Sequence, residues 1–156
     1  MNSAPSHHQL FVDLSTELLS RGQCIRFRAP GRSMQPTILD GDLITVAPVA
    51  PTEVKPGDII LYRSAMGVTA HRVQRIERRH TTCPLFTLRG DAPGSPEEPV
   101  AAPRLLGKVV RVERGGRLID PYSWRAMGCR TALLSLSRLK RWIRLKAAYL
   151  MTCFSH

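Results

Sequence analysis

The chain has 156 residues, of which 43% are hydrophobic, and it carries a formal net charge of +11. This length and composition suit one globular domain with a hydrophobic core, and they exclude a short peptide and a multidomain assembly. The positive charge predicts attraction to an acidic partner, but residues 104–156 contain 12 basic and 2 acidic residues, whereas residues 1–103 contain 11 and 10.

The N-terminal part predicts a short amphipathic helix followed by a strand. Leucine and phenylalanine recur at helical spacing over about residues 8–20, with acidic residues between them, which is the pattern of a helix with one apolar face. Residues 24–29 then alternate apolar with basic side chains, as in a half-buried strand. Pro30 and Gly31 end that strand.

The middle of the chain predicts a mainly β domain made of short strands and turns. Apolar and β-branched runs are separated by Gly-Asp pairs and prolines, which favour turns. The expected strands are residues 43–47, 59–62, 68–76, 85–89, 108–112 and 117–119. Residues 92–103 contain four prolines, so we predict a loop there, with no central strand and no long helix.

Beyond Pro121 the pattern changes to that of basic helices. Leucine, tryptophan and isoleucine form an apolar stripe over about residues 123–154, and arginine and lysine crowd the remaining surface. We therefore expect a β domain over residues 1–121 and basic amphipathic helices over residues 122–156. Such helices either lie on an anionic membrane or pack their apolar face on the protein, which is the commoner arrangement.

Ser33 and His71 are the strongest candidates for catalytic chemistry. Ser33 lies between Gly31 and Pro36, in a bend that can present its hydroxyl at the surface and leave its N–H free for an oxyanion. A serine hydroxyl becomes nucleophilic when a base removes its proton, and histidine has a suitable pKa near neutrality. A lone histidine on a strand is more often a packing or surface residue, so the assignment of His71 depends on Ser33.

A serine–histidine pair benefits from an acid that fixes the imidazole tautomer and stabilises the imidazolium. Asp91 and Glu97, at the edge of the proline-rich segment, are the candidates for this role. The alternative is that both are solvated loop acids. No lysine competes well as the base, because Lys55 precedes a proline in a predicted turn and the other lysines lie in the basic C-terminal segment.

These residues belong to an ordered series of short motifs. The series is Gly31-Arg32-Ser33-Met34-Gln35-Pro36-Thr37, Gly41-Asp42, Gly57-Asp58-Ile59-Ile60, His71-Arg72-Val73, Arg89-Gly90-Asp91 and Gly107-Lys108-Val109. In this order, over about residues 23–112, it resembles the type I signal peptidases. It is most similar to the branch of archaea, the endoplasmic reticulum and some bacteria, which uses serine with histidine instead of lysine.

The resemblance implies a coiled antiparallel, barrel-like sheet of the S24/S26 peptidase type with an N-terminal helix. It implies Ser33 as the nucleophile, His71 as the general base and Asp91 as an aspartate that supports the site. In that branch the orienting acid follows the Gly-Asp motif by six positions, which selects Glu97. Residues beside the nucleophile, Met34 and Pro36, are implied to contact substrate, and no metal or organic cofactor is expected.

The sequence departs from that family in the expected membrane anchor. The N-terminus has no positively charged region before an apolar run, so we predict no signal peptide. No stretch approaches the roughly 20 apolar residues of a transmembrane helix. We therefore expect a cytoplasmic protein, which is peripheral to the inner face of the membrane if its basic helices bind anionic lipid.

The leading interpretation is a serine endopeptidase of signal peptidase I type that cleaves a precursor protein or a peptide. The alternative is a catalytically inactive module of the same fold with a binding or regulatory role. Nucleic-acid binding through the basic tail is the weakest hypothesis, because the sequence has no recognisable helix-turn-helix, zinc finger or aromatic RNA motif. We expect no specific nucleic-acid partner.

Overall fold

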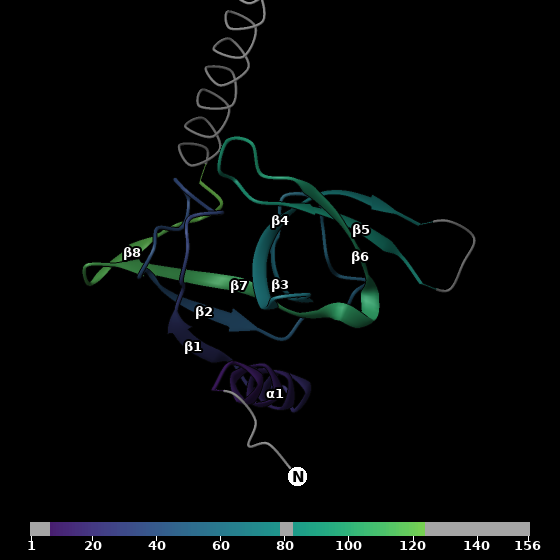
Figure 1. Ribbon diagram of the computed structural model, residues 1–156, viewed down its shortest axis with the longest axis horizontal. Coiled ribbons are helices and arrows are strands. Elements are labelled where there is room, and N and C mark those ends of the chain that lie inside the picture. The colour runs from purple at the N-terminus through teal and green to yellow at the C-terminus, as the bar shows by residue number, and fades with distance from the viewer. Residues whose placement is uncertain (1–6, 79–82, 124–156) are drawn as a thin grey trace, which may run out of the picture.

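The computed structural model describes residues 7–78 and 83–123 (Figure 1). The described part begins with a helix, α1 (His7–Ser20), and continues as a series of strands. The strands are β1 (Ile25–Arg28), β2 (Leu43–Ala47), β3 (Ile59–Ser64), β4 (Gly67–Glu77), β5 (Leu85–Arg89), β6 (Glu97–Ala101), β7 (Leu105–Arg114) and β8 (Arg117–Ile119), with a 3-10 turn, η1 (Ala102–Arg104), before β7.

The strands form a single antiparallel sheet that curls into a half-barrel (Figure 1). Their order is β1-β2-β7-β3-β4-β5-β6, and β8 pairs with β7. Because β7 lies between β2 and β3, a strand late in the sequence pairs with one of the first strands. The mainly β fold with a coiled antiparallel sheet and an N-terminal helix is therefore confirmed.

The centre of the sheet is β3, which is covered on both faces. Ile59 and Leu61 belong to one buried apolar cluster, with residues of β2 and β7. Ile60 and Tyr62 belong to a second cluster, with residues of β4, β5 and β6. Successive side chains of a strand point to opposite faces, so a continuous apolar run is what a strand between two clusters requires.

The N-terminal helix packs against the first cluster. Leu19 is buried there, and the ring of Phe11 meets that of Phe27 edge to face, with 5.1 Å between the centroids. Edge-to-face contacts of this kind stabilise aromatic pairs beyond the area they bury. The helix predicted over residues 8–20 is thus confirmed, and it fixes the position of β1.

The proline-rich segment differs from the prediction. The sequence predicts a loop over residues 92–103, whereas the structure places β6 and η1 within it. β6 lies at the edge of the strand order and pairs only with β5 there. Pro99 has no N–H to donate, and an edge strand tolerates that loss because one of its sides is open. The prediction of no central strand in this segment is consistent with that position.

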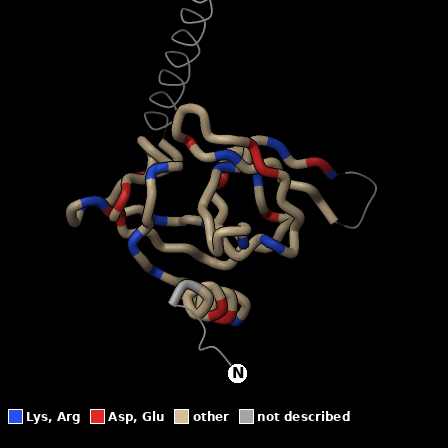
Figure 2. Tube along the Cα trace, viewed as in Figure 1, with Lys and Arg blue, Asp and Glu red and all other residues tan. Residues whose placement is uncertain are grey.

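The predictions for the C-terminal helices and for the domain boundary at residue 121 depend on residues 124–156, which lie outside the described residues. In the described part, basic and acidic residues are interspersed along the chain (Figure 2). Among residues 7–78 and 83–123, no helix has both the length and the apolar character needed to cross a bilayer.

Candidate active site

Ser33 is exposed at a bend between β1 and β2. Gly31 has a φ of +93°, which glycine adopts without strain, and its N–H donates to Asp40 Oδ1 at 2.7 Å. Met34 is buried in the first cluster, and its carbonyl accepts the Ile38 N–H at 3.0 Å. The bend therefore presents Ser33 at the surface while the following residue attaches the segment to the core.

The turn after β5 contacts the backbone of Ser33. The Ala92 N–H donates to the Ser33 carbonyl at 2.9 Å. A Cβ on Gly90 would lie 2.4 Å from that carbonyl oxygen, so only glycine fits this contact. β5, which leads into this turn, pairs with β4 through Arg89 and Arg72, and Arg72 is bonded to Asp91 of the turn at 2.7 Å. The Ser33 segment is thus held next to the strand that carries His71.

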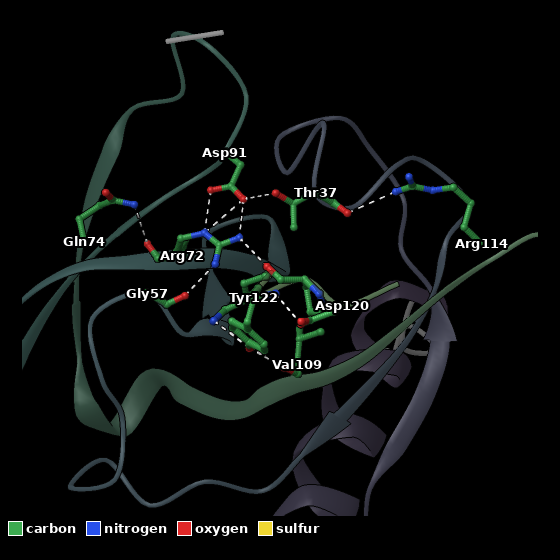
Figure 3. Close-up of polar contacts among 11 residues, drawn as sticks. Thr37, Gly57, Arg72, Gln74, Asp91, Val109, Arg114, Asp120 and Tyr122 are labelled. Carbon is green, nitrogen blue, oxygen red and sulfur yellow. Dashed lines mark hydrogen bonds and ion pairs between the residues drawn. The ribbon is translucent and has the colours of Figure 1, made fainter. Parts of the chain in front are cut away.

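Asp91 is buried and joins the Ser33 segment to β4 (Figure 3). Its carboxylate accepts hydrogen bonds of 2.9, 3.2 and 2.7 Å from the Arg72 guanidinium and one of 2.6 Å from the Thr37 hydroxyl. Arg72 also donates to the carbonyls of Gly57 at 2.7 Å and Pro121 at 3.3 Å. We call Thr37, Arg72 and Asp91 the Asp91 anchor, because their contacts link segments that are distant in sequence.

His71 reaches a different carboxylate through a tyrosine. Its Nδ1 lies 3.0 Å from the Tyr62 hydroxyl, and that hydroxyl donates to Glu98 Oε2 at 2.7 Å. Glu98 Oε1 accepts a hydrogen bond of 2.8 Å from the Arg104 guanidinium. We call Tyr62, His71, Glu98 and Arg104 the His71 network. Its members come from β3, β4, β6 and η1, so the curled sheet is what assembles it.

The surroundings of His71 favour its neutral form and leave one ring nitrogen without a hydrogen-bond partner among the described residues. Burial lowers the pKa of His71, because desolvation disfavours the imidazolium, although the negative charges of Glu98 and Asp91 oppose this effect. Its Nε2 is the one buried side-chain nitrogen or oxygen without a hydrogen-bond partner among residues 7–78 and 83–123. Buried polar atoms are normally paired, so an exception at a histidine indicates a functional site.

The turn after β5 contacts Ser33 and, through Arg72, the strand of His71, but no hydrogen bond joins Ser33 and His71 within the described residues. Glu97 is exposed at the start of β6, and Asp91 is bound by Arg72. The hydrogen bond of the His71 ring goes to Tyr62 and not to either of these predicted acids. The carboxylate that stands behind His71 is that of Glu98, the neighbour of the residue expected from the motif spacing.

An apolar groove of about 520 Å³ adjoins Ser33. It lies between β1, β3, β4 and α1, and Ser33 and Met34 form part of its wall, whereas neither His71 nor Pro36 lines it. Pro36 is half-buried and follows a cis peptide bond. Apolar side chains dominate the lining, chiefly those of Phe11, Phe27, Ile38, Leu61 and Val68. A concave apolar surface beside a polar group is typical of a ligand site.

Sequence reasoning missed Tyr62, Glu98 and the partnership of Arg72 with Asp91. Tyr62 had a usable signal. It lies two residues after Ile60, which pairs with His71, so Tyr62 is on the same face of the sheet as the residue opposite His71. Arg72 had one too, since a buried arginine requires a carboxylate. Glu98 had none, because the segment that carries it reads as a loop.

The curled antiparallel sheet, with a serine bend fixed against a Gly-Asp turn, defines a mainly β half-barrel domain. The family model of the Peptidase S24-like proteins matches residues 2–103. The match covers more than half of the chain, which therefore belongs to the Peptidase S24-like family. This family supports peptidase chemistry in general, and some of its members are inactive. No curated protein and no solved structure matched the chain.

Proposed function

We propose that this chain is a serine endopeptidase of signal-peptidase type, with Ser33 as the nucleophile and His71 as the general base. The main support is the buried Nε2 of His71, which has no hydrogen-bond partner among the described residues. His71 lies on β4, which pairs with β5, and the turn after β5 contacts the Ser33 backbone. The lowered pKa of His71 keeps the imidazole neutral and able to accept a proton near neutral pH. Hydrogen bonds between such groups are often long before substrate binds and tighten in the complex.

In the proposed reaction, Ser33 Oγ attacks the carbonyl carbon of a peptide bond, and its proton passes to His71 Nε2. The Ser33 N–H, which has no acceptor among the described residues, stabilises the oxyanion. The C–N bond breaks as His71 gives the proton to the leaving amine, and an acyl ester remains on Ser33. Water then attacks the ester and transfers a proton to His71, which passes it to Ser33 Oγ as the ester C–O bond breaks. The acid product is released and ionises, and Ser33 and neutral His71 are regenerated.

The groove beside Ser33 supports a peptide substrate with apolar side chains near the scissile bond. Met34 and Ser33 share one wall of this groove, so an apolar side chain seated there brings the next peptide bond toward Ser33 Oγ. Precursor proteins with an apolar segment before the cleavage site fit this requirement. Peripheral contact of residues 122–156 with an anionic membrane is a separate proposal, which liposome sedimentation of the chain with and without those residues tests.

A serine-directed fluorophosphonate tests the proposal without knowledge of the substrate. In wild type, Ser33 Oγ is expected to displace fluoride from phosphorus and become covalently labelled. Ser33→Ala and His71→Gln should both lose labelling, whereas Ser20→Ala, which removes an exposed hydroxyl on α1, should retain it. Equal labelling of wild type and Ser33→Ala would contradict the assignment of Ser33. Cleavage of candidate precursors by wild type but not by Ser33→Ala would then identify the substrate.

A catalytically inactive binding module of the same fold is the second candidate. It is favoured by the missing hydrogen bond between Ser33 and His71 in the described residues and by the inactive members of the family. A folded wild-type protein that is not labelled, but that binds apolar peptides in a manner sensitive to Met34→Ala, would select this function.

A further inference from the structure

We propose that Tyr62, held by Glu98, fixes His71 in the Nδ1-protonated tautomer and thereby makes Nε2 the basic nitrogen of the site. Tyr62 is then a positioning residue that acts through His71. The inference rests on the proposed function for the use of that nitrogen, but the tautomer itself is measurable in the absence of any activity.

The hydrogen-bond directions in the His71 network leave a single arrangement. An ionised carboxylate only accepts hydrogen bonds, and a phenol has one proton to donate. The shorter contact, 2.7 Å, runs from the Tyr62 hydroxyl to Glu98 Oε2. In the remaining 3.0 Å contact, His71 Nδ1 must therefore carry the proton and donate it to the Tyr62 oxygen. In neutral imidazole one nitrogen carries the proton and the other the lone pair, so Nε2 is the acceptor.

Arg104 keeps Glu98 in the form that this arrangement needs. Its guanidinium donates to Glu98 Oε1 at 2.8 Å and to the carbonyl of Arg63 at 2.8 Å, and it lies 5.8 Å from the centroid of the Tyr62 ring. Burial alone would raise the pKa of Glu98, but the hydrogen bonds from Tyr62 and Arg104 hold it below its usual value. Glu98 is therefore a carboxylate at neutral pH and accepts the phenol proton.

The same chain of contacts stabilises the imidazolium that forms when Nε2 takes a proton. Nδ1–H then donates to the Tyr62 oxygen, which the negative charge of Glu98 polarises. The proton of Tyr62 stays on its oxygen, because burial and the adjacent Glu98 raise the pKa of the phenol. The other charged group that acts on His71 is Asp91, which is neutralised by Arg72. Arg104 is paired with Glu98.

Nitrogen NMR of the histidine-labelled full chain tests the tautomer directly. The His71 resonances are assigned by their loss in His71→Gln. In wild type above pH 7, we expect a protonated Nδ1 and an unprotonated Nε2. Glu98→Ala frees the Tyr62 hydroxyl to donate to Nδ1, so the proton should move to Nε2, and Tyr62→Phe should give a mixture of the two tautomers. Tyr122→Phe, the same change at a half-buried phenol outside the network, should leave the wild-type spectrum.

A wild-type His71 with its proton on Nε2 would overturn the inference. So would a spectrum that is unchanged in both Tyr62→Phe and Glu98→Ala. Tyr62→Phe retains the buried ring, so this variant decides the question even if Glu98→Ala does not fold. These outcomes do not depend on whether Ser33 reacts.

The pH dependence of fluorophosphonate labelling separates a positioning role from a structural one. In Tyr62→Phe, the imidazolium loses its acceptor, so the midpoint of the acid limb should move to lower pH and the plateau rate should fall by about tenfold to a hundredfold. A purely structural role would reduce the reactive fraction without moving the midpoint. If wild type is not labelled at all, the proposed function fails, while the NMR result still decides the role of Tyr62.

Discussion

His71 and Arg72 are consecutive residues of β4, and their side chains leave opposite faces of the sheet to meet different carboxylates. In the Asp91 anchor the side chains of Arg72 and Asp91 are 4% and 0% exposed. In the His71 network those of Arg104 and Glu98 are 39% and 35% exposed, and a tyrosine stands between the acid and the histidine. One strand therefore supplies both a fixed ion pair and a titratable base.

The difference in burial indicates a difference in role. A fully buried ion pair cannot lose one partner without leaving an uncompensated charge, so the Asp91 anchor sets the positions of Thr37 and the turn beside Ser33. A half-exposed pair is screened by solvent and contributes little to stability. The His71 network is therefore suited to setting the protonation of a side chain instead of the path of the backbone. Four changes can break or sharpen this comparison.

The largest expected effect is that of Arg72→Ala on stability. The variant leaves the Asp91 carboxylate buried without its guanidinium partner, so we expect the free energy of unfolding to fall by about 3–5 kcal/mol. Urea denaturation measures this change. Arg21→Ala is the control, because its ion pair with Glu17 is 68% and 55% exposed, and we expect a loss of about 0.3–0.5 kcal/mol. Similar small losses in both variants would refute the anchoring role.

Gly90→Ala tests whether the turn after β5 positions Ser33. The new Cβ would lie 2.4 Å from the Ser33 carbonyl oxygen and 2.7 Å from Ser95 Oγ, so the backbone of the Ser33 segment must shift. We expect a loss of about 1–3 kcal/mol in stability and a fall of roughly a hundredfold in the labelling rate of the folded protein, because a small misplacement of a reacting group has effects of this size.

Gly107→Ala is the matched control for that variant. Its Cβ would lie 2.6 Å from the carbonyl oxygen of Ala47, which is a similar steric conflict between β7 and β2, away from Ser33. We expect a comparable loss of stability with an unchanged labelling rate per folded molecule. Equal losses of labelling in the two variants would mean that Gly90 acts only through stability.

The pH dependence of stability tests the environment of His71. Its folded-state pKa is lowered from 6.5, so the unfolded chain binds the proton more tightly. Well above pH 6.5 both states are neutral and the group has no effect. As the pH falls below about 6.5 toward the folded pKa, stability should fall. Urea unfolding at several pH values should show this slope in wild type and a weaker slope in His71→Gln. A constant difference between the two proteins would contradict a buried, neutral His71.

The sequence predicts those parts of the fold in which local pattern reports burial. The alternation of residues 24–29 corresponds to β1, and the unbroken apolar run of residues 59–62 corresponds to the doubly covered β3. The bend at Ser33 follows from the glycine and proline that flank it. Each of these signals is local, because it depends only on the backbone preferences and the burial of neighbouring residues.

The sequence does not predict which of two adjacent acids stands behind His71. Glu98 pairs with Leu88, and Leu88 pairs with Val73, which shares a face of β4 with His71. A shift of one residue in the pairing of β6 would present Glu97 instead. That register depends on β5 and on an edge strand that contains a proline, so the spacing of the motif alone does not identify Glu98 as the partner of Tyr62.

Arg104→Ala has a small expected effect on stability and compares the two carboxylates most directly. Its ion pair with Glu98 is half-exposed, so the free energy of unfolding should change by only about 0.2–1 kcal/mol, against the much larger loss expected for Arg72→Ala. A loss equal to that of Arg72→Ala would show that burial does not distinguish the two pairs.

The informative readout for Arg104→Ala is the pH at which the Glu98 carboxylate becomes protonated. In wild type the pKa of Glu98 lies below its usual 4.5, because the hydrogen bonds from Tyr62 and Arg104 outweigh the effect of burial. The stabilisation that this carboxylate provides is present above the unfolded pKa and is lost as the pH falls through the folded one. Without Arg104 the loss should begin at higher pH, visible as an earlier change in the His71 nitrogen resonances on acid titration. Arg104→Lys retains a positive charge, so its change should begin at a pH between those of wild type and Arg104→Ala. The site then keeps the attraction but not the fixed guanidinium geometry.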